Sequence, residues 1–243
     1  MVDRELAFVL ALRFGAITHI QCGLILVQEA GIAVEDFAST ISVFSDELGM
    51  PVFDLSTQTV ESLGAKLAFC TPEDGSNIEI MSPGNPDTPL SQSLQGFIDR
   101  RGEGHFALML EAADPDLEAE GLLKRGLNVL PLMAGAGGRD AHPNSTYGVL
   151  IRIYPTNSLA GLLPPGQNAD IPASALSGIQ RVVLAVRDLN EALLTYGEKF
   201  ALPVSNPVVD AKRGVRTALC SSPSGGVIEL DRAAMSGARF WIE

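Results

Sequence analysis

Apolar and polar residues follow one order along this chain, and that order is repeated three times. Each repeat begins with a short apolar run and continues with apolar residues at helical spacing. It closes on Gly or Ala followed by Met or Leu, then Pro or Asn, then Val. The repeats span residues 31–52, 108–129 and 182–204. A pattern repeated along a chain indicates copies of one structural unit.

An aspartate marks the same point of each repeat. Asp36, Asp114 and Asp188 each follow the apolar run, where a carboxylate can accept hydrogen bonds from the free amides that begin a helix. Apolar residues then recur every three or four positions over 37–48 and 189–200. The pattern predicts a strand, a capped helix and a sharp helix end in each repeat.

The segments that follow the helices are also repeated. Residues 68–80 (AFCTPEDGSNIEI) match residues 218–230 (ALCSSPSGGVIEL), and residues 147–153 (YGVLIRI) stand at the same place in the middle copy. Such runs are typical of strands. We therefore expect an α+β fold in which each unit is a strand, a helix and a run of strands, with a period of about 75 residues.

The charge of the chain excludes one class of function. The 243 residues include 17 basic and 29 acidic side chains, for a net charge of −12, whereas nucleic-acid binding requires a basic face. Cys70 and Cys220 fall at equivalent apolar strand positions, so we interpret them as small buried hydrophobic residues. This cysteine usage fits a reducing, cytoplasmic location.

The N-terminal segment is apolar enough to raise the question of a membrane span. Within residues 6–27, however, Arg13 and His19 interrupt the apolar run, and acidic residues precede it where a signal peptide requires basic ones. We therefore expect a core strand or helix that is additional to the first unit, and no membrane partner.

Several blocks of the sequence occur together in one known family. The blocks GIAVEDF and LGMPV, then NIEIMSP, RGEG and AHPNSTYGVLIRI, resemble the methylmalonyl-CoA epimerase branch of the vicinal oxygen chelate (glyoxalase I-like) superfamily. The resemblance implies paired βαβββ modules whose curved sheets enclose a cavity. It divides the chain into an extension (1–27), a complete two-module domain (28–155), a linker (156–178) and a third module (179–243). We expect a homo-oligomer that forms through this unpaired third module.

The resemblance also implies where metal ligands would stand. In the family each module supplies a His at the start of its first strand and a Glu or Gln in its last strand. The first-strand positions here hold Glu29, Ala107 and Arg181, and the last-strand positions hold Glu79, Arg152 and Glu229. Because a guanidinium cannot ligate a metal, we expect neither a metal ion nor another cofactor.

In the family's geometry Glu29, Glu79 and Arg152 would converge on one cavity. Arg152 could replace the charge of the lost ion, and one glutamate could move a proton at a carbon next to a carbonyl. This predicts a metal-independent isomerase, epimerase or lyase that acts on a small carbonyl, carboxylate or acyl-thioester substrate. Two alternatives stay open: a buried ionic plug of the same three residues, and a protein of this fold that binds or sequesters a small molecule without catalysis.

Three further residues are candidates for substrate binding. His142 matches a family feature near the cavity mouth, although capping the turn at 144–146 also explains it. Glu61 precedes a strand roughly where the family has a second acid–base glutamate, but the loop alignment there is loose and favours an ordinary solvated glutamate. Ala107 stands at the ligand position of the second module. His105, two residues earlier, would become a ligand only if the register were shifted.

Overall fold

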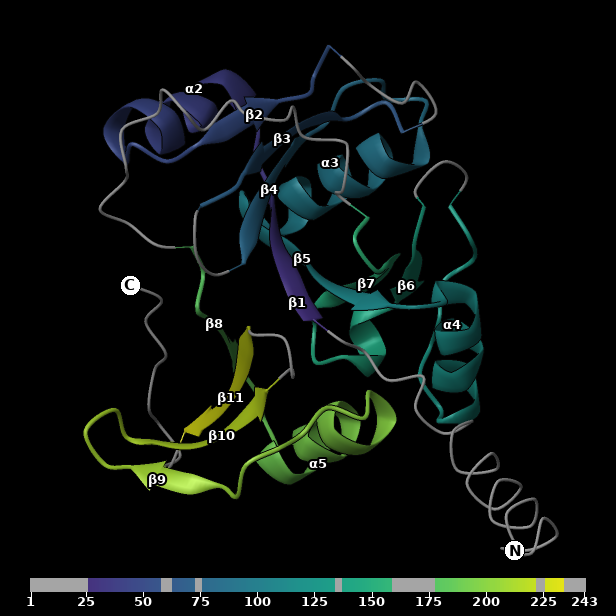
Figure 1. Ribbon diagram of the computed structural model, residues 1–243, viewed down its shortest axis with the longest axis vertical. Helices are drawn as coiled ribbons and strands as arrows, with labels where there is room; N and C mark the ends of the chain where they lie inside the picture. The colour runs from purple at the N-terminus through teal and green to yellow at the C-terminus, as the bar shows by residue number, and fades with distance from the viewer. Residues whose placement is uncertain are drawn as a thin grey trace, which may run out of the picture.

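Three copies of one strand–helix–strands arrangement make up the part of the chain that the computed structural model describes, residues 26–57, 63–72, 76–133, 137–158, 178–221 and 226–233 (Figure 1). The first copy consists of β1 (Leu26–Ala33), α2 (Phe37–Ser42) continued by a π-helical turn (Val43–Glu47), β2 (Val52–Asp54), β3 (Lys66–Cys70) and β4 (Asn77–Ser82). The helix α3 (Pro89–Arg101) connects it to the second copy.

The second and third copies repeat this arrangement. The second consists of β5 (Gly104–Ala112), α4 (Pro115–Lys124), β6 (Arg139–Ala141), a short 3-10 helix (Pro143–Ser145) and β7 (Leu150–Pro155). The third consists of β8 (Arg181–Ala185), α5 (Leu189–Leu193) continued by a π-helical turn (Leu194–Lys199), β9 (Val208–Asp210), β10 (Val215–Ser221) and β11 (Val227–Ala233).

The strands form two sheets. The first two copies share a seven-stranded sheet in the order β2-β3-β4-β1-β5-β7-β6, and the third forms a four-stranded sheet in the order β8-β11-β10-β9. In each copy the first strand runs parallel to the last, and β1 pairs antiparallel with β5 to join the first two copies. The predicted α+β class with repeated βαβββ modules is confirmed.

The predicted helix starts are confirmed in all three modules. Asp36 accepts a hydrogen bond from the Ser39 amide at 3.0 Å, and Asp114 accepts one from the Leu117 amide at 3.0 Å. Asp188 accepts two, from the amides of residues 190 and 191. The predicted helix ends are confirmed as well, because the closing residue has a positive φ in each: Gly49 (63°), Gly126 (80°) and Ala201 (56°).

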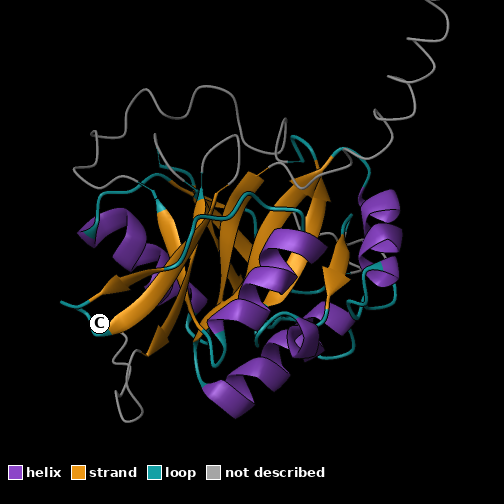
Figure 2. Cartoon of the chain, turned by 90° about the horizontal axis from the view of Figure 1, so that it is seen from below, coloured by secondary structure: helices purple, strands orange, loops and turns teal. Residues whose placement is uncertain are grey.

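Helix α3 lies on one face of the seven-stranded sheet, which we call the inner face. Its buried residues Leu90, Leu94 and Ile98 pack in one cluster with Ala107 and Met109 of β5. Helices α2 and α4 pack against the other, outer face, where Figure 2 shows helices flanking the strands. Since side chains alternate along a strand, only every second residue of β1, β4, β5 and β7 faces α3.

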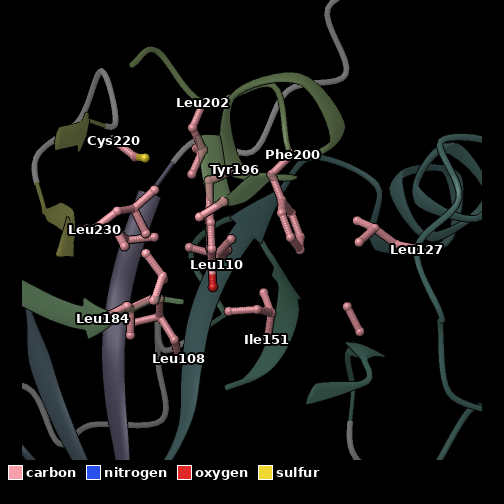
Figure 3. Close-up of a cluster of buried hydrophobic side chains, with 14 of the residues drawn as sticks. Leu108, Leu110, Leu127, Ile151, Leu184, Tyr196, Phe200, Leu202, Cys220 and Leu230 are labelled. Atoms are coloured by element: carbon pink, nitrogen blue, oxygen red, sulfur yellow. The ribbon is translucent and has the colours of Figure 1, made fainter. Parts of the chain in front are cut away.

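The third module packs on the outer face of the second. Figure 3 shows Leu108, Leu110 and Ile151 of the second module in one cluster with Tyr196 and Phe200 of the third. Tyr196 and Phe200 are fully buried, and the Tyr196 hydroxyl donates a hydrogen bond to the Thr146 carbonyl at 3.0 Å. A backbone bridge between Ser76 and Ile179 also connects the third module to the first.

Parts of the predicted domain organisation fall on residues that the structure does not describe. Most of the N-terminal extension (1–25) and most of the linker (159–177) lie outside the described residues, and the proposed boundaries at 27, 155 and 178 stay predictions. Among the described residues, no helix is long and apolar enough to cross a membrane.

Candidate functional site

One row of side chains crosses the inner face of the seven-stranded sheet. Glu29 of β1 lies between Asn77 of β4 and Met109 of β5, Met109 lies opposite Arg152 of β7, and Arg152 lies opposite Asp140 of β6. Directly paired residues point to the same face of a sheet. The row therefore brings Glu29 and Arg152, far apart in the sequence, onto the face of the sheet against which α3 packs.

A second row lies beside the first. Glu79 of β4 is opposite Gly31 of β1, and Gly31 is opposite Ala107 of β5. A Cβ atom on Gly31 would stand 2.6 Å from the end of Met81 and 2.7 Å from the end of Met109. A larger residue there would require the ends of the two methionines to shift, whereas glycine leaves room for them on this face.

The strand register places the six residues at the family's ligand positions at equivalent points of the three modules. Glu29 pairs with the residue two before Glu79, Ala107 pairs with the residue two before Arg152, and Arg181 pairs with the residue two before Glu229. At this pair of positions the first module thus holds two glutamates. The second module holds Ala and Arg, and the third holds Arg and Glu.

Glu29 and Glu79 are buried, and no ion pair joins either of them to a cation within the part of the chain that the structure describes. Glu29 is 0% exposed, and neither of its carboxylate oxygens has a hydrogen-bond partner among the described residues; the same holds for Oε2 of Glu79. Burial raises the pKa of Glu29 well above its ordinary value, and the charges of Glu79 and Glu111 raise it further. Burial raises the pKa of Glu79 to about 7, against the opposing charge of Arg152.

Arg152 forms its ion pair with Asp140. Its Nε and Nη2 atoms donate to the two oxygens of Asp140, each at 2.7 Å, and both side chains are buried. The guanidinium carbon also lies 5.9 Å from the ring centroid of Tyr154. One alternative was an ionic plug made by Arg152 with Glu29 and Glu79. That interpretation is wrong about the partner, because the carboxylate bound to Arg152 is on β6.

The sequence alone did not point to Asp140 or Glu111. Glu111 is buried two residues beyond Met109 on β5, and it accepts a hydrogen bond from the Asn157 amide at 2.8 Å. The alternation along β5, which puts Ala107, Met109 and Glu111 on one face, was a signal that could have found it. Asp140 carried no such signal, because its short strand pairs with β7 in a register that the sequence does not fix.

A pocket of about 350 Å³ opens beside Arg152. Arg152 and Asp140 line it from the sheet, Phe97 lines it from α3, and His142 lines it from the loop before β7. His142 also accepts a hydrogen bond from the Asn144 amide at its Nδ1 atom, at 3.1 Å. The position of His142 is thus compatible with both roles considered for it, substrate binding near the cavity mouth and capping of the turn at 144–146.

The other candidate residues lie elsewhere. Ala107 is buried among the apolar residues under α3 and does not line this pocket. His105 is exposed at the start of β5, two residues before the ligand position. Glu61 lies outside the described residues. Glu29 and Glu79 lie on the same inner face as Arg152, and the charge of Arg152 acts on Glu79, but neither glutamate is among the residues that line the pocket.

The residues at the family's four ligand positions do not fit a divalent ion. Two are carboxylates, Ala107 has no donor atom, and Arg152 carries a permanent positive charge. Within the part of the chain that the structure describes, no group of three His, Cys, Asp or Glu residues is arranged to hold a metal ion.

The corresponding carboxylate of the third module has cationic partners. Arg181 and Arg213 each donate to Glu229 at 2.5 Å, and the Thr217 hydroxyl donates to it at 3.0 Å. Burial alone would raise the pKa of Glu229, but these hydrogen bonds outweigh it and lower the pKa to about 2. This carboxylate therefore stays ionised, unlike those of the first module.

Comparison with known proteins supports the predicted superfamily. Residues 28–142 match the family model described as Glyoxalase/Bleomycin resistance protein/Dioxygenase superfamily. Methylmalonyl-CoA epimerase from Mycobacterium tuberculosis is similar at 25% identity over 58% of this chain and 95% of its own, with a TM-score of 0.46. A search of curated protein sequences finds no match.

Two further solved structures also match this chain. A variant of methylmalonyl-CoA epimerase from Streptomyces coelicolor, in complex with 2-nitronate-propionyl-CoA, has 23% identity over 56% of this chain and 97% of its own, with a TM-score of 0.47. A mutant of 4-hydroxymandelate synthase from the same organism has 16% identity over 86% of this chain and 63% of its own, with a TM-score of 0.61. This last likeness concerns the fold alone.

Proposed function

We propose that this chain, whose residues 28–142 match the glyoxalase/bleomycin resistance/dioxygenase superfamily model, is a metal-independent enzyme that moves a proton at a carbon next to a carbonyl. The observation that carries this proposal is the pair of buried glutamates at the family's ligand positions. The pKa of Glu79 lies at about 7, where a carboxyl group can both accept and return a proton near neutral pH.

The two carboxyl groups take different parts in the step. Glu79 in its ionised form accepts the proton from the carbon, and the electron pair of the C–H bond moves to the carbonyl oxygen to give an enolate. Glu29, whose pKa is raised further by its neighbours, is the protonated partner that returns a proton to the carbon. Return to the opposite face gives epimerisation, return to a neighbouring atom gives isomerisation, and loss of a leaving group gives a lyase reaction.

Arg152 stabilises the oxygen that becomes negatively charged. Its bonds to Asp140 use Nε and Nη2, so Nη1 has donors that this ion pair does not occupy. Asp140 holds the guanidinium in one orientation, which lowers the cost of arranging it around an enolate. Arg152 lies on the same face of the sheet as the two glutamates and also lines the pocket.

Proton exchange in deuterated water tests the proposal. Small 2-oxo acids, β-keto acids and acyl thioesters would be incubated with the protein after chelation of metal ions, and deuterium uptake at the carbon would be followed by NMR. We expect uptake with the wild type and a loss of roughly a hundredfold or more with Glu79→Gln. Activity that appears only when zinc, cobalt or manganese is added would refute metal independence.

A second candidate function is binding without catalysis. The observation in its favour is that the pocket is lined by Arg152 and Asp140 but not by either glutamate. A binder of this fold would release its ligand unchanged, and Glu29→Gln and Glu79→Gln would bind it as well as the wild type. Mass spectrometry of the ligand before and after incubation separates the two functions.

A further inference from the structure

Positive charge gathers around the pocket of an otherwise acidic chain. The net charge is −12, yet the residues that line the pocket include Arg100, Arg101 and Arg152 with a single carboxylate, Asp140. Asp140 neutralises Arg152 through two hydrogen bonds. The excess positive charge at the pocket therefore comes from Arg100 and Arg101.

Neither of these two arginines has a carboxylate partner in the described part of the chain. Arg101 lies 5.9 Å from the ring centroid of Phe97 and donates to the Gly148 carbonyl at 3.4 Å, a long contact. Both Phe97 and Gly148 line the pocket as well. The Arg101 side chain thus lies along the pocket wall with most of its donors unused.

The helix end explains part of this placement. Arg100 and Arg101 occupy the last turn of α3, where positive side chains stabilise the negative end of a helix. Lys124 occupies the same place in α4, but it forms an ion pair with Glu120 on its own helix. The helix dipole thus accounts for a basic residue at this point, but not for two unpaired arginines lining a pocket.

We propose that this pocket binds a compact anionic compound whose carboxylate or phosphate group is held by Arg100 and Arg101 at its mouth. Guanidinium groups bind both anions through paired hydrogen bonds. A volume of about 350 Å³ lies at the small end of the range for ligand sites, so the nucleotide of a coenzyme A thioester would stay outside. The inference names the substrate class of the proposed enzyme, but the binding itself does not depend on catalysis.

Calorimetry with malonate, inorganic phosphate and neutral malonamide tests the inference. At low ionic strength we expect malonate and phosphate to bind, and malonamide to bind roughly tenfold more weakly or not at all. Arg101→Ala should weaken malonate binding roughly tenfold, and Arg101→Lys should restore part of it. Lys124→Ala removes one charge at the matched helix end and should change binding less than about twofold.

Three results would overturn the inference: equal binding of malonate and malonamide, equal weakening by Arg101→Ala and Lys124→Ala, or tighter binding of acetyl-CoA than of malonate. The test is independent of the proposed reaction. Malonate binding through Arg101 in a protein that exchanges no protons would refute the reaction and support the anion site. Exchange on neutral carbonyl compounds that is unaffected by Arg101→Ala would support the reaction and refute the site.

Discussion

Glu79 and Glu229 occupy the same position in two modules of one chain, and their surroundings shift their pKa values in opposite directions. Glu79 lies beside Glu29 and has a pKa of about 7, whereas Glu229 lies beside Arg181 and has a pKa of about 2. Glu229 accepts hydrogen bonds from Arg213 and from Arg181 at the first-strand position, whereas burial sets the pKa of Glu79 and its first-strand position holds Glu29. A structural module would be stabilised by the second arrangement, whereas the first costs stability and leaves a carboxyl group that titrates near neutral pH.

The first prediction concerns stability against pH. Between the ordinary pKa of 4.5 and the folded value of about 7, the folded protein keeps a proton on Glu79 that the unfolded chain releases. The free energy of unfolding therefore falls as the pH rises through this window, by about 3 kcal/mol over its full extent. Glu79→Gln should remove the Glu79 part of this slope, leave the part due to Glu29, whose pKa is also raised, and stabilise the protein above pH 7, as measured by urea unfolding at a series of pH values.

Glu229→Gln is the matched control for that series. Glu229 has a lowered pKa, so its contribution is present above pH 4.5 and is lost as the pH falls toward about 2. The substitution should destabilise the protein at pH 7 and leave the slope between pH 4.5 and 7 unchanged. A slope in Glu79→Gln as steep as that of the wild type would show that Glu79 does not change its protonation over this range on unfolding, and the proposed base would be lost with it.

The second prediction separates a structural from a catalytic role of Arg152. Arg152→Ala should destabilise the protein by about 3–5 kcal/mol, because it leaves the buried carboxylate of Asp140 without a partner. The double variant Arg152→Met with Asp140→Leu removes both charges and should recover most of this loss. We expect the double variant to fold and to remain inactive in the proton-exchange assay. Activity in the folded double variant would mean that the ion pair only fills space.

The sequence predicted more of the fold than of the site, and the residues explain why. Asp36, Asp114 and Asp188 act on amides two or three positions away, so local spacing suffices to place them. The placement of Glu29 and Arg152 in one row depends on the pairing of β1, β5 and β7, and there the repeat and the family resemblance supplied the register. Asp140 depends on a three-residue strand with no repeated counterpart, and no local pattern identifies it as the partner of Arg152.

The third prediction tests whether the second and third modules unfold together. Tyr196 is fully buried between them, so Tyr196→Ala should cost about 3–5 kcal/mol and lower the unfolding midpoint of both modules alike. Tyr196→Phe removes only the hydrogen bond to the Thr146 carbonyl and should cost about 1 kcal/mol. Hydrogen exchange read separately in β7 and β10 checks the coupling. Loss of protection in β10 alone would show that the modules unfold independently.

The fourth prediction concerns self-association. In the first module β1 has neighbours on both sides, β4 and β5, but within the described residues β8 pairs only with β11. Val183 on β8 is 52% exposed, whereas Gly31 at the equivalent position of β1 is buried. An unpaired strand edge with an exposed apolar residue is a site for pairing with another chain.

Antiparallel pairing of β8 with β8 of a second copy satisfies a twofold axis and repeats the β1–β5 pairing already present in the chain. We therefore expect a dimer by light scattering, and we expect Val183→Lys to give a monomer because it places two charges at the twofold contact. Val209 on β9, at the other edge of the same sheet, is 68% exposed, and Val209→Lys is the matched control that should stay dimeric. If Val209→Lys dissociates the dimer and Val183→Lys does not, the two copies pair through β9. The first strand of the third module is then not paired with the third module of a second copy.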